Sequence, residues 1–484
     1  MNLRKTRISL ALAAGLAGSA AAAPEVILDS HPEWIALRER AIGYAKKNMK
    51  KIPGWRDQMT CMPQWDRIWL WDSCFMSFYA GLAPDGVNGL GNLDNLYAMQ
   101  EKDGRIAMAY DYATRRSAFG DCSNPPLCAW AEWEYARRTG DRSRLERAYA
   151  AGTKLFGWFK ANRRHRSGLY WFEDTNASGL DNSPRSAHVY GLNGNTYAGA
   201  DRFSGFGIDY IDLSCQQVLA ARSLAKIAKA IGRSAAEASE WEREADGLSA
   251  LINERLWNDR SGFYHDGLDY GYQFMQEPRK TICGFWPLVA RVADARRAAR
   301  LVKHLENPEE FATRHPVPTL SRDDINYDPK GCFWRGGVWA PTNYMVVKGL
   351  KEFGYHALAC EIACRHLSCM AELLGGEWDS VWECYAPECA APATRKNPGE
   401  YARKDFVGWG GLGPIVMLVE DVLGLEINAL ENKIIWRVKE KGRQGVRNLP
   451  YNGGRLTLVG DYDENGKFKY AVDAPCAVDV VVLH

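Results

Sequence analysis

The chain has 484 residues, of which 46% are hydrophobic and 25% charged, so it is long enough to bury one large core or two smaller ones. Its formal net charge of +2 provides no basic excess of the kind that binds nucleic acid or an anionic membrane. The aromatic content is high, with 18 Trp, 22 Tyr and 16 Phe. Extra core aromatics explain part of this content, and a cleft lined by flat apolar faces, suited to sugar rings, explains tryptophans in loop-like sequence.

Residues 1–22 are predicted to be a cleaved secretory signal. Cations precede an apolar stretch from Ile8 to Leu16, and small residues follow up to Ala23. We place the cleavage after Ala22, because Pro24 would be poorly tolerated directly after a cut. No later apolar run is long enough to span a bilayer. We therefore expect an exported protein without membrane insertion, most simply in a bacterial periplasm.

The cysteines do not predict a disulfide framework or a metal site. They number 13, which is odd, and several lie in helical patterns like small apolar core residues. Cys384 and Cys389 flank a candidate site, and the sequence leaves open whether they pair. No Cys/His spacing matches a zinc site, so we predict neither a metal nor a cofactor.

Most of the chain shows apolar residues at helical spacing. Gly, Pro, Asn and Asp clusters separate the predicted helices, which cover residues 31–50, 67–82, 87–101, 125–139, 142–163, 205–231, 235–257, 281–304, 336–353, 355–374 and 405–423. Short connections alternate with long ones rich in Trp, Gly, Asp and Arg. This alternation fits a toroid of inner and outer helices over residues 23–425, with its long loops, and the site, on one face.

From about Glu426 the pattern changes to short β-type runs separated by turns. The runs are Ile434 to Val438, Arg455 to Val459, Phe468 to Val472 and Ala477 to Leu483. The predicted fold class is therefore all-α, with a small C-terminal all-β appendage at residues 426–484. We expect this appendage to cover one side of the helical domain.

Two of the five stretches that combine acidic, Arg and Trp residues lie at predicted helix starts. Trp71 and Asp72 end the first stretch, which begins at Gln64. Asp72 is either a first-turn acid favoured by the helix dipole or, beside the indole of Trp71, a ligand of sugar hydroxyls. In the second stretch Asn124 precedes two prolines, and helix capping is the favoured interpretation.

The other three stretches lie in loops. Asp181 stands in Ser-Gly-Leu-Asp-Asn-Ser-Pro-Arg, where Gly and Pro shape the loop, and Arg185 ends this stretch. The fourth stretch, from Phe333 to Pro341, holds two Trp, an Arg and two Gly, a composition that a plain helix start does not require. The fifth places Glu383 among aromatic residues, and Gly-Glu-Tyr at 399–401 and Trp409 follow it.

Two loop carboxylates in an aromatic cleft predict glycoside cleavage. One carboxylic acid protonates the leaving oxygen, and the other activates water or attacks the anomeric carbon. A turn aspartate is the ordinary alternative for Asp181. The sequence contains no serine nucleophile elbow, phosphate loop or dinucleotide fingerprint.

These stretches, taken in order from about Trp65 to Trp409, resemble the (α/α)6-barrel glycoside hydrolases of families 37 and 63. That group includes trehalases, processing α-glucosidase I, and bacterial mannosylglycerate and glucosylglycerate hydrolases. The resemblance implies that Asp181 is the general acid and that Glu383, in Trp-Glu-Cys-Tyr, is the general base. It also implies inversion of configuration. Trehalases carry Gln where this chain has Asn124, which argues against trehalose itself.

The resulting prediction is an exported inverting α-glycosidase that acts on a terminal, α-glucosidic residue of an oligosaccharide or small glycoside. Its predicted sugar-binding residues are Trp71, Asp72, Asn124, Arg185, Arg335, Trp339, Glu400 and Trp409. Glu400 is the rival of Glu383 for the role of base. Three alternatives stay open on the same toroid: an inverting phosphorylase, a polysaccharide lyase and a non-catalytic glycan-binding protein.

Overall fold

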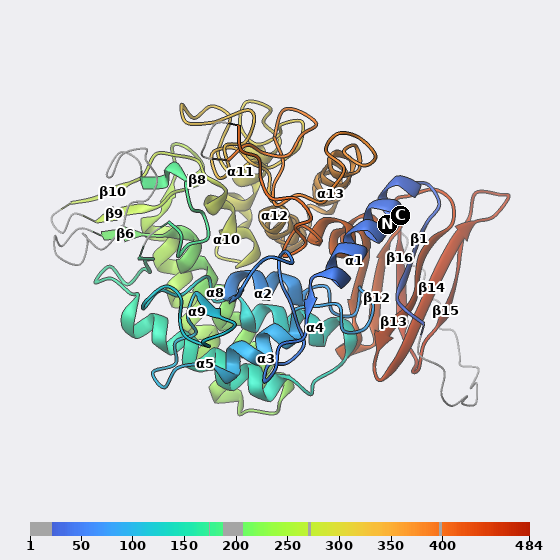
Figure 1. Cartoon of the computed structure of the whole chain (residues 1–484), viewed down its shortest axis with the longest axis horizontal. Coiled ribbons are helices and arrows are strands. Elements are labelled where there is room, and N and C mark those ends of the chain that lie inside the picture. Colours follow the sequence, from blue (N-terminus) through green and yellow to red (C-terminus); the bar gives the residue numbers. More distant parts are fainter. Residues whose placement is uncertain (1–21, 174, 187–206, 270–272, 396–398) are drawn as a thin grey trace.

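A helical body carries β-sheets on one side (Figure 1). The computed structural model describes residues 22–173, 175–186, 207–269, 273–395 and 399–484, so the predicted signal at 1–22 lies almost entirely outside the described residues. The prediction of a mainly helical chain with a small C-terminal β part is confirmed. Within the described ranges, no helix is long and apolar enough to cross a membrane.

The helices alternate between buried and more exposed ones along the chain. The buried set comprises α2 (Leu70–Ser77), α4 (Cys128–Thr139), α8 (Ile211–Ala230), α12 (Ala340–Glu352) and the π-helix η4 (Leu412–Val422). The partners that follow or precede them are α1 (Pro32–Lys47), α3 (Leu90–Ala98), α5 (Leu145–Asn162), α9 (Ala235–Arg255) and α13 (His356–Ala371). These partners bury one apolar face each, and this amphipathic pattern places the buried set at the centre.

Several predicted helices differ from the observed ones. The helix expected at 205–231 begins only at Ile211, after strand β6 (Gly207–Asp209), and the one expected at 405–423 begins only at Leu412. The helix expected at 281–304 is broken into η3 (Ile282–Phe285), α10 (Trp286–Val289) and α11 (Ala295–Leu305). Arg291 adopts a left-handed backbone, with φ 55°, and the Asp294 side chain caps α11 by accepting from the Arg297 N–H. The helix expected from 67 begins only at Leu70, because strand β4 (Arg67–Trp69) pairs with β5 (Ala109–Asp111).

The β part contains two sheets. One has the order β1-β13-β14-β15 and consists of β1 (Glu25–Leu28), β13 (Gln444–Tyr451), β14 (Gly454–Tyr462) and β15 (Phe468–Asp473). The other has the order β11-β12-β16 and consists of β11 (Leu425–Asn428), β12 (Lys433–Arg437) and β16 (Asp479–Leu483). The sequence did not predict β1, which lies antiparallel to β13 and brings the start of the described chain into the sheet near its end.

All thirteen cysteines are free. Cys384, which is buried, and Cys389, which is exposed, are both free, so the pair that the sequence left open is not bonded in this structure.

Candidate active site

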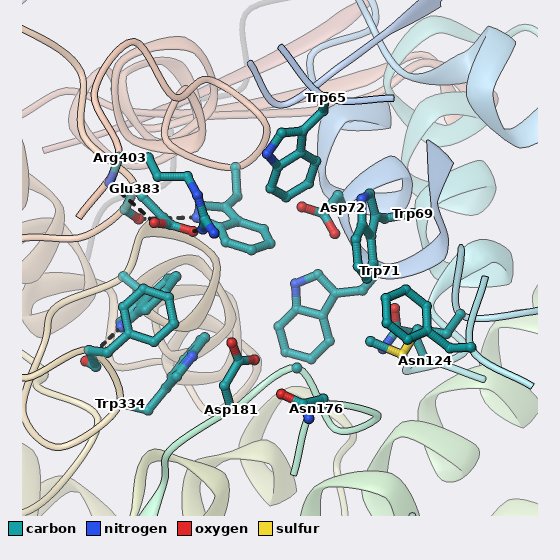
Figure 2. Close-up of a pocket in the computed structure, with 16 residues that line it drawn as sticks. Trp65, Trp69, Trp71, Asp72, Asn124, Asn176, Asp181, Trp334, Glu383 and Arg403 are labelled. Carbon is teal, nitrogen blue, oxygen red and sulfur yellow. Dashed lines mark hydrogen bonds and ion pairs between the residues drawn. The ribbon is translucent and has the colours of Figure 1, made fainter. Parts of the chain in front are cut away.

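The candidate site is a cavity of about 270 Å³. It lies where the chain enters the buried helices: Trp71 and Asp72 open α2, Asn124 precedes α4, Trp339 precedes α12, and Trp409 precedes η4. Figure 2 shows the carboxylates of Asp72, Asp181 and Glu383 around this one cavity. The residues that line it are Trp65, Trp69, Trp71, Asp72, Met108, Phe119, Asn124, Asn176, Gly179, Asp181, Phe333, Trp334, Trp339, Glu383, Arg403 and Trp409.

Six of the sixteen described residues that line the cavity are tryptophans. Trp334 and Trp339 stack with their ring centroids 3.8 Å apart, and Trp409 packs 5.6 Å from Trp339. The turn before Trp334 is strained, since Cys332 and Phe333 both have positive φ, 36° and 63°. Hydrogen bonds hold that turn, and strain maintained in this way is typical of binding sites. Flat apolar faces of this kind suit the C–H faces of sugar rings.

The loop that carries Asp181 is fixed by its neighbours. The Thr175 hydroxyl donates to the Asp181 carbonyl (2.8 Å), and the Asn182 side chain donates to the Cys332 carbonyl (2.9 Å). The Trp334 N–H donates to the side-chain oxygen of Asn182 at 2.9 Å. The loop is thus joined to the strained turn, and Asp181, half-buried, faces the cavity.

Gly179 explains how this loop approaches the wall so closely. Its φ is +81°, a left-handed conformation that favours glycine. A Cβ at this position would lie 3.1 Å from the ring of Trp71. The loop therefore packs directly on one wall of the cavity.

Glu383 is buried, with 2% of its surface exposed, and is bonded to Arg403 in three ways. The Arg403 Nη1 donates to Glu383 Oε1 (2.5 Å), and the Arg403 N–H donates to Oε2 (3.2 Å). The Glu383 N–H donates to the Arg403 carbonyl (2.8 Å). Burial raises the pKa of Glu383, and the neighbouring Arg403 offsets part of that rise.

Asp72 is also buried, but its bonded partner is a thiol. Cys61 Sγ donates to Asp72 Oδ1 at 2.9 Å. Burial raises the pKa of Asp72 to about 7, the Cys61 hydrogen bond lowers it, and the charge of Glu383 raises it further. Two buried carboxyl groups of the same cavity therefore have different partners.

Asn124 lines the cavity and also supports the Asp181 loop. Its side chain donates to the Ala177 carbonyl at 2.8 Å. Capping was the favoured interpretation of Asn124, but α4 begins after Leu127, where no side chain caps the helix. Through this hydrogen bond, Asn124 connects the segment before α4 to the loop that carries Asp181.

Three residues predicted to bind sugar are not among the cavity lining. Arg185 is fully buried and donates to Asp212 and Asp266 at 2.6–2.8 Å, so its guanidinium is committed to these carboxylates. Arg335 donates from Nε to the Asn182 carbonyl at 3.2 Å and so contacts the backbone of the loop that carries Asp181. Glu400 is exposed, and its carbonyl accepts from the Arg395 N–H at 2.8 Å. Arg185 and Arg335 therefore contact protein groups beside the cavity, and their sugar-binding roles stay a prediction.

The sequence reasoning missed several lining residues. Trp65, Trp69 and Trp334 lie inside stretches that it singled out, and their composition could have indicated them. Arg403 lies two residues after the Gly-Glu-Tyr at 399–401, with no signal that it faces Glu383. The sequence likewise gives no signal that Asn176 lines the cavity.

A second cavity, of about 380 Å³, lies at the other ends of the buried helices, against β11 and β12. Several of its charged groups are paired with one another: Lys348 contacts Glu134 at 2.9 Å and Glu420 at 3.2 Å, and Arg437 contacts Glu426 at 3.0 Å. Its composition differs from the tryptophan-lined cavity, which is the better candidate for a sugar site.

Comparison with known proteins finds relatives of this chain in both sequence and structure. The chain is 25% identical over 404 residues to an uncharacterized protein of Borreliella burgdorferi, covering 81% of this chain and 80% of that protein. It is 24% identical over 363 residues to the mannosylglycerate hydrolase of Rubrobacter radiotolerans, covering 59% of this chain and 79% of that protein. The crystal structure of a family 63 mannosylglycerate hydrolase from Thermus thermophilus in complex with glucose superposes with a TM-score of 0.64 at 23% identity. It covers 78% of this chain and 99% of that one, which shows a shared fold.

Residues 65–401 match the family described as the mannosylglycerate hydrolase MGH1-like glycoside hydrolase domain. This range includes Asp72, Asp181 and Glu383 and most of the tryptophan wall. The chain belongs to this family and is a glycoside hydrolase.

Proposed function

We propose that the protein is an exported, inverting α-glycosidase that removes a terminal α-linked sugar, an α-glucoside first of all, from a small glycoside or oligosaccharide. The single observation that carries this proposal is that Asp181 and Glu383, from separate loops, share one tryptophan-lined cavity (Figure 2). The (α/α)6 toroid is part of the proposal, and the alternation of buried and exposed helices supports it. The predicted signal at 1–22 supports export.

In the proposed reaction, Asp181 is the acid and Glu383 is the base. Protonated Asp181 transfers its proton to the glycosidic oxygen as the bond to the anomeric carbon breaks. Ionised Glu383 accepts a proton from a water that attacks the opposite face of that carbon, so an α-glycoside releases a β-configured sugar. This chemistry requires the two carboxyl groups to stand about 6.5–9.5 Å apart, leaving space for the water.

The size and charge of the cavity favour hydrolysis of a terminal residue. Ligand cavities typically measure about 300–1,000 Å³, so a volume of about 270 Å³ suits a single sugar ring better than a long chain. Among the residues that the structure describes, three carboxyl groups and one Arg line it, and that Arg is bonded to Glu383. A phosphorylase needs a cationic phosphate pocket at this place, so the lining argues against that alternative.

The test is proton NMR of the anomeric signals during incubation with α-glucosides, α-galactosides and α-mannosides, in the absence of phosphate. The panel includes mannosylglycerate, because two relatives are named mannosylglycerate hydrolases. We expect a β-configured sugar from one α-glycoside. Release of the α-configured sugar as first product would refute inversion, and activity that requires phosphate would indicate a phosphorylase.

The roles of the two acids are tested by Asp181→Asn and Glu383→Gln. Each variant keeps the size of the side chain and is expected to lose at least ~100-fold in kcat, since it removes the proton transfer. Circular dichroism and the urea midpoint check that each variant folds. Near-full activity in either variant would remove that residue from its proposed role.

A further inference from the structure

Arg403 is the one cation among the described residues that line the active-site cavity, and it contacts Glu383 through both its side chain and its backbone. We infer that Arg403 is the positioning residue of this site, which fixes the carboxylate of Glu383 for attack by water. The inference rests on the proposed role of Glu383 as base. It adds a residue that acts through Glu383.

The backbone makes this pairing specific to Arg403. The segment that carries Arg403 lies against the segment of Glu383, with an antiparallel bridge between Trp382 and Lys404. The Glu383 N–H donates to the Arg403 carbonyl at 2.8 Å, and the Arg403 N–H donates to Oε2 at 3.2 Å. The Trp409 indole adds a third tie by donating to the Glu383 carbonyl at 3.1 Å. Glu383 is therefore held at its backbone as well as at its carboxylate.

The side chain of Arg403 completes the arrangement. Its Nη1 donates to Oε1 at 2.5 Å, and its guanidinium lies over the Trp65 ring, 5.7 Å from the centroid. A carboxylate offers about four lone pairs, and these contacts use two of them. Lone pairs therefore remain for a water, while both oxygens of Glu383 are held.

Asp72 shows what this cavity does to a carboxyl group whose side-chain partner, among the described residues, is a thiol and not a cation. Both groups are buried, and both have a raised pKa for which burial is the largest cause. Asp72, bonded to the thiol of Cys61, reaches a pKa of about 7. Without Arg403, we expect Glu383 to behave in the same way and to be protonated at a pH where the reaction needs it ionised.

The experiment measures the pH dependence of kcat/KM for the wild type, Arg403→Met and Arg403→Lys on the substrate found by NMR. The acidic limb of this profile reports the ionisation of the free enzyme's base. In Arg403→Met we expect this limb to move to higher pH by about 1–3 units, with kcat at pH 7 falling at least ~10-fold and KM changing little. Arg403→Lys keeps the charge, so its acidic limb should lie between that of the wild type and that of Arg403→Met.

Arg395→Met is the matched control. Arg395 also lowers the pKa of Glu383 by its charge, but it lies over the Phe333 ring, and among the described residues it makes no hydrogen bond to that carboxylate. We expect the acidic limb of the Arg395→Met profile to move by less than half as much as that of Arg403→Met. Addition of millimolar guanidinium ion to Arg403→Met should recover activity, whereas the control should not respond.

The outcomes separate this inference from the function on which it rests. An acidic limb that stays in place in Arg403→Met, or a rise in KM with kcat unchanged, would overturn the positioning role while Glu383→Gln remains inactive. Full activity of Glu383→Gln would refute the proposed base itself. If Arg403→Met fails to fold, the limb of Arg403→Lys decides: a shift in the same direction supports the role, and a wild-type profile overturns it.

Discussion

Replacing Arg185 by Met tests whether this residue supports the fold or binds the sugar. The guanidinium is fully buried and makes four hydrogen bonds, two to each of Asp212 and Asp266. It also lies 4.5 Å from the centroid of the Tyr210 ring. A methionine fills much of the space but offers no donor. The substitution would therefore leave two buried carboxyl groups without their cation.

The structure sets the size of the expected effect. Removal of one partner of a buried ion pair costs about 3–5 kcal/mol in the free energy of unfolding. Because one cation here serves two carboxylates, we expect Arg185→Met to lie at the upper end, about 5 kcal/mol. The loss should grow as the pH rises, since the uncompensated carboxyl groups would have raised pKa values and would be tolerated in the folded protein only when protonated.

Urea unfolding followed by tryptophan fluorescence measures this loss at pH 5 and pH 8. Arg166→Met is the control, because Arg166 is 63% exposed and contacts Asp269 at 3.1 Å. An exposed pair of this kind contributes about 1 kcal/mol or less. If Arg185→Met lost less than about 1 kcal/mol and instead raised KM, the buried-pair reasoning would be wrong and the prediction that Arg185 binds the sugar would be supported.

Three further changes test the site. The first is Asp72→Asn. Because the raised pKa of Asp72 favours folding only while this group is protonated, the wild type should lose stability as the pH rises from about 4 to 7, and the free energy of unfolding of Asp72→Asn relative to the wild type should increase by roughly 1.4 kcal/mol per pH unit and level off above pH 7. A difference in stability that does not depend on pH would contradict this. Gly179→Ala places a Cβ against Trp71 in a left-handed backbone, which should displace the loop that carries Asp181. We therefore expect kcat/KM to fall at least ~10-fold, and unchanged kinetics would show that the position of this loop is unimportant. Glu400→Gln should keep kcat within about threefold, since its side chain is exposed and outside the cavity lining, and a loss like that of Glu383→Gln would restore Glu400 as the rival base.

Sequence patterns singled out several of the residues that line the cavity, because these residues lie at recognisable places in the chain. Asp72, Asn124, Trp339 and Trp409 stand directly before or at the first turns of buried helices, where composition changes from loop to helix. The first turns of the buried helices lie around one cavity, so residues that are far apart in the chain meet there. Asp181 stood out through the Gly and Pro of its loop.

What the sequence could not show was which partner each charged group takes. Arg185 lies four residues after Asp181, but its partners Asp212 and Asp266 lie 27 and 81 residues further along the chain. Arg403 and Glu383 are 20 residues apart and meet only because their segments pair. Such contacts depend on tertiary packing, and no local pattern encodes them.

The pairing of β1 with β13 determines when the terminal sheet can form. Glu25 contacts Arg447, which lies 422 residues later in the chain. At about 5–20 residues per second, synthesis separates these two residues by on the order of 20–80 s. The helices are built from local contacts and can form during that interval, whereas Val26, Ile27 and Leu28 must wait without their strand partner. Closure of this sheet is therefore a late event, and a chain cut short before β13 would present an unpaired apolar strand to its neighbours.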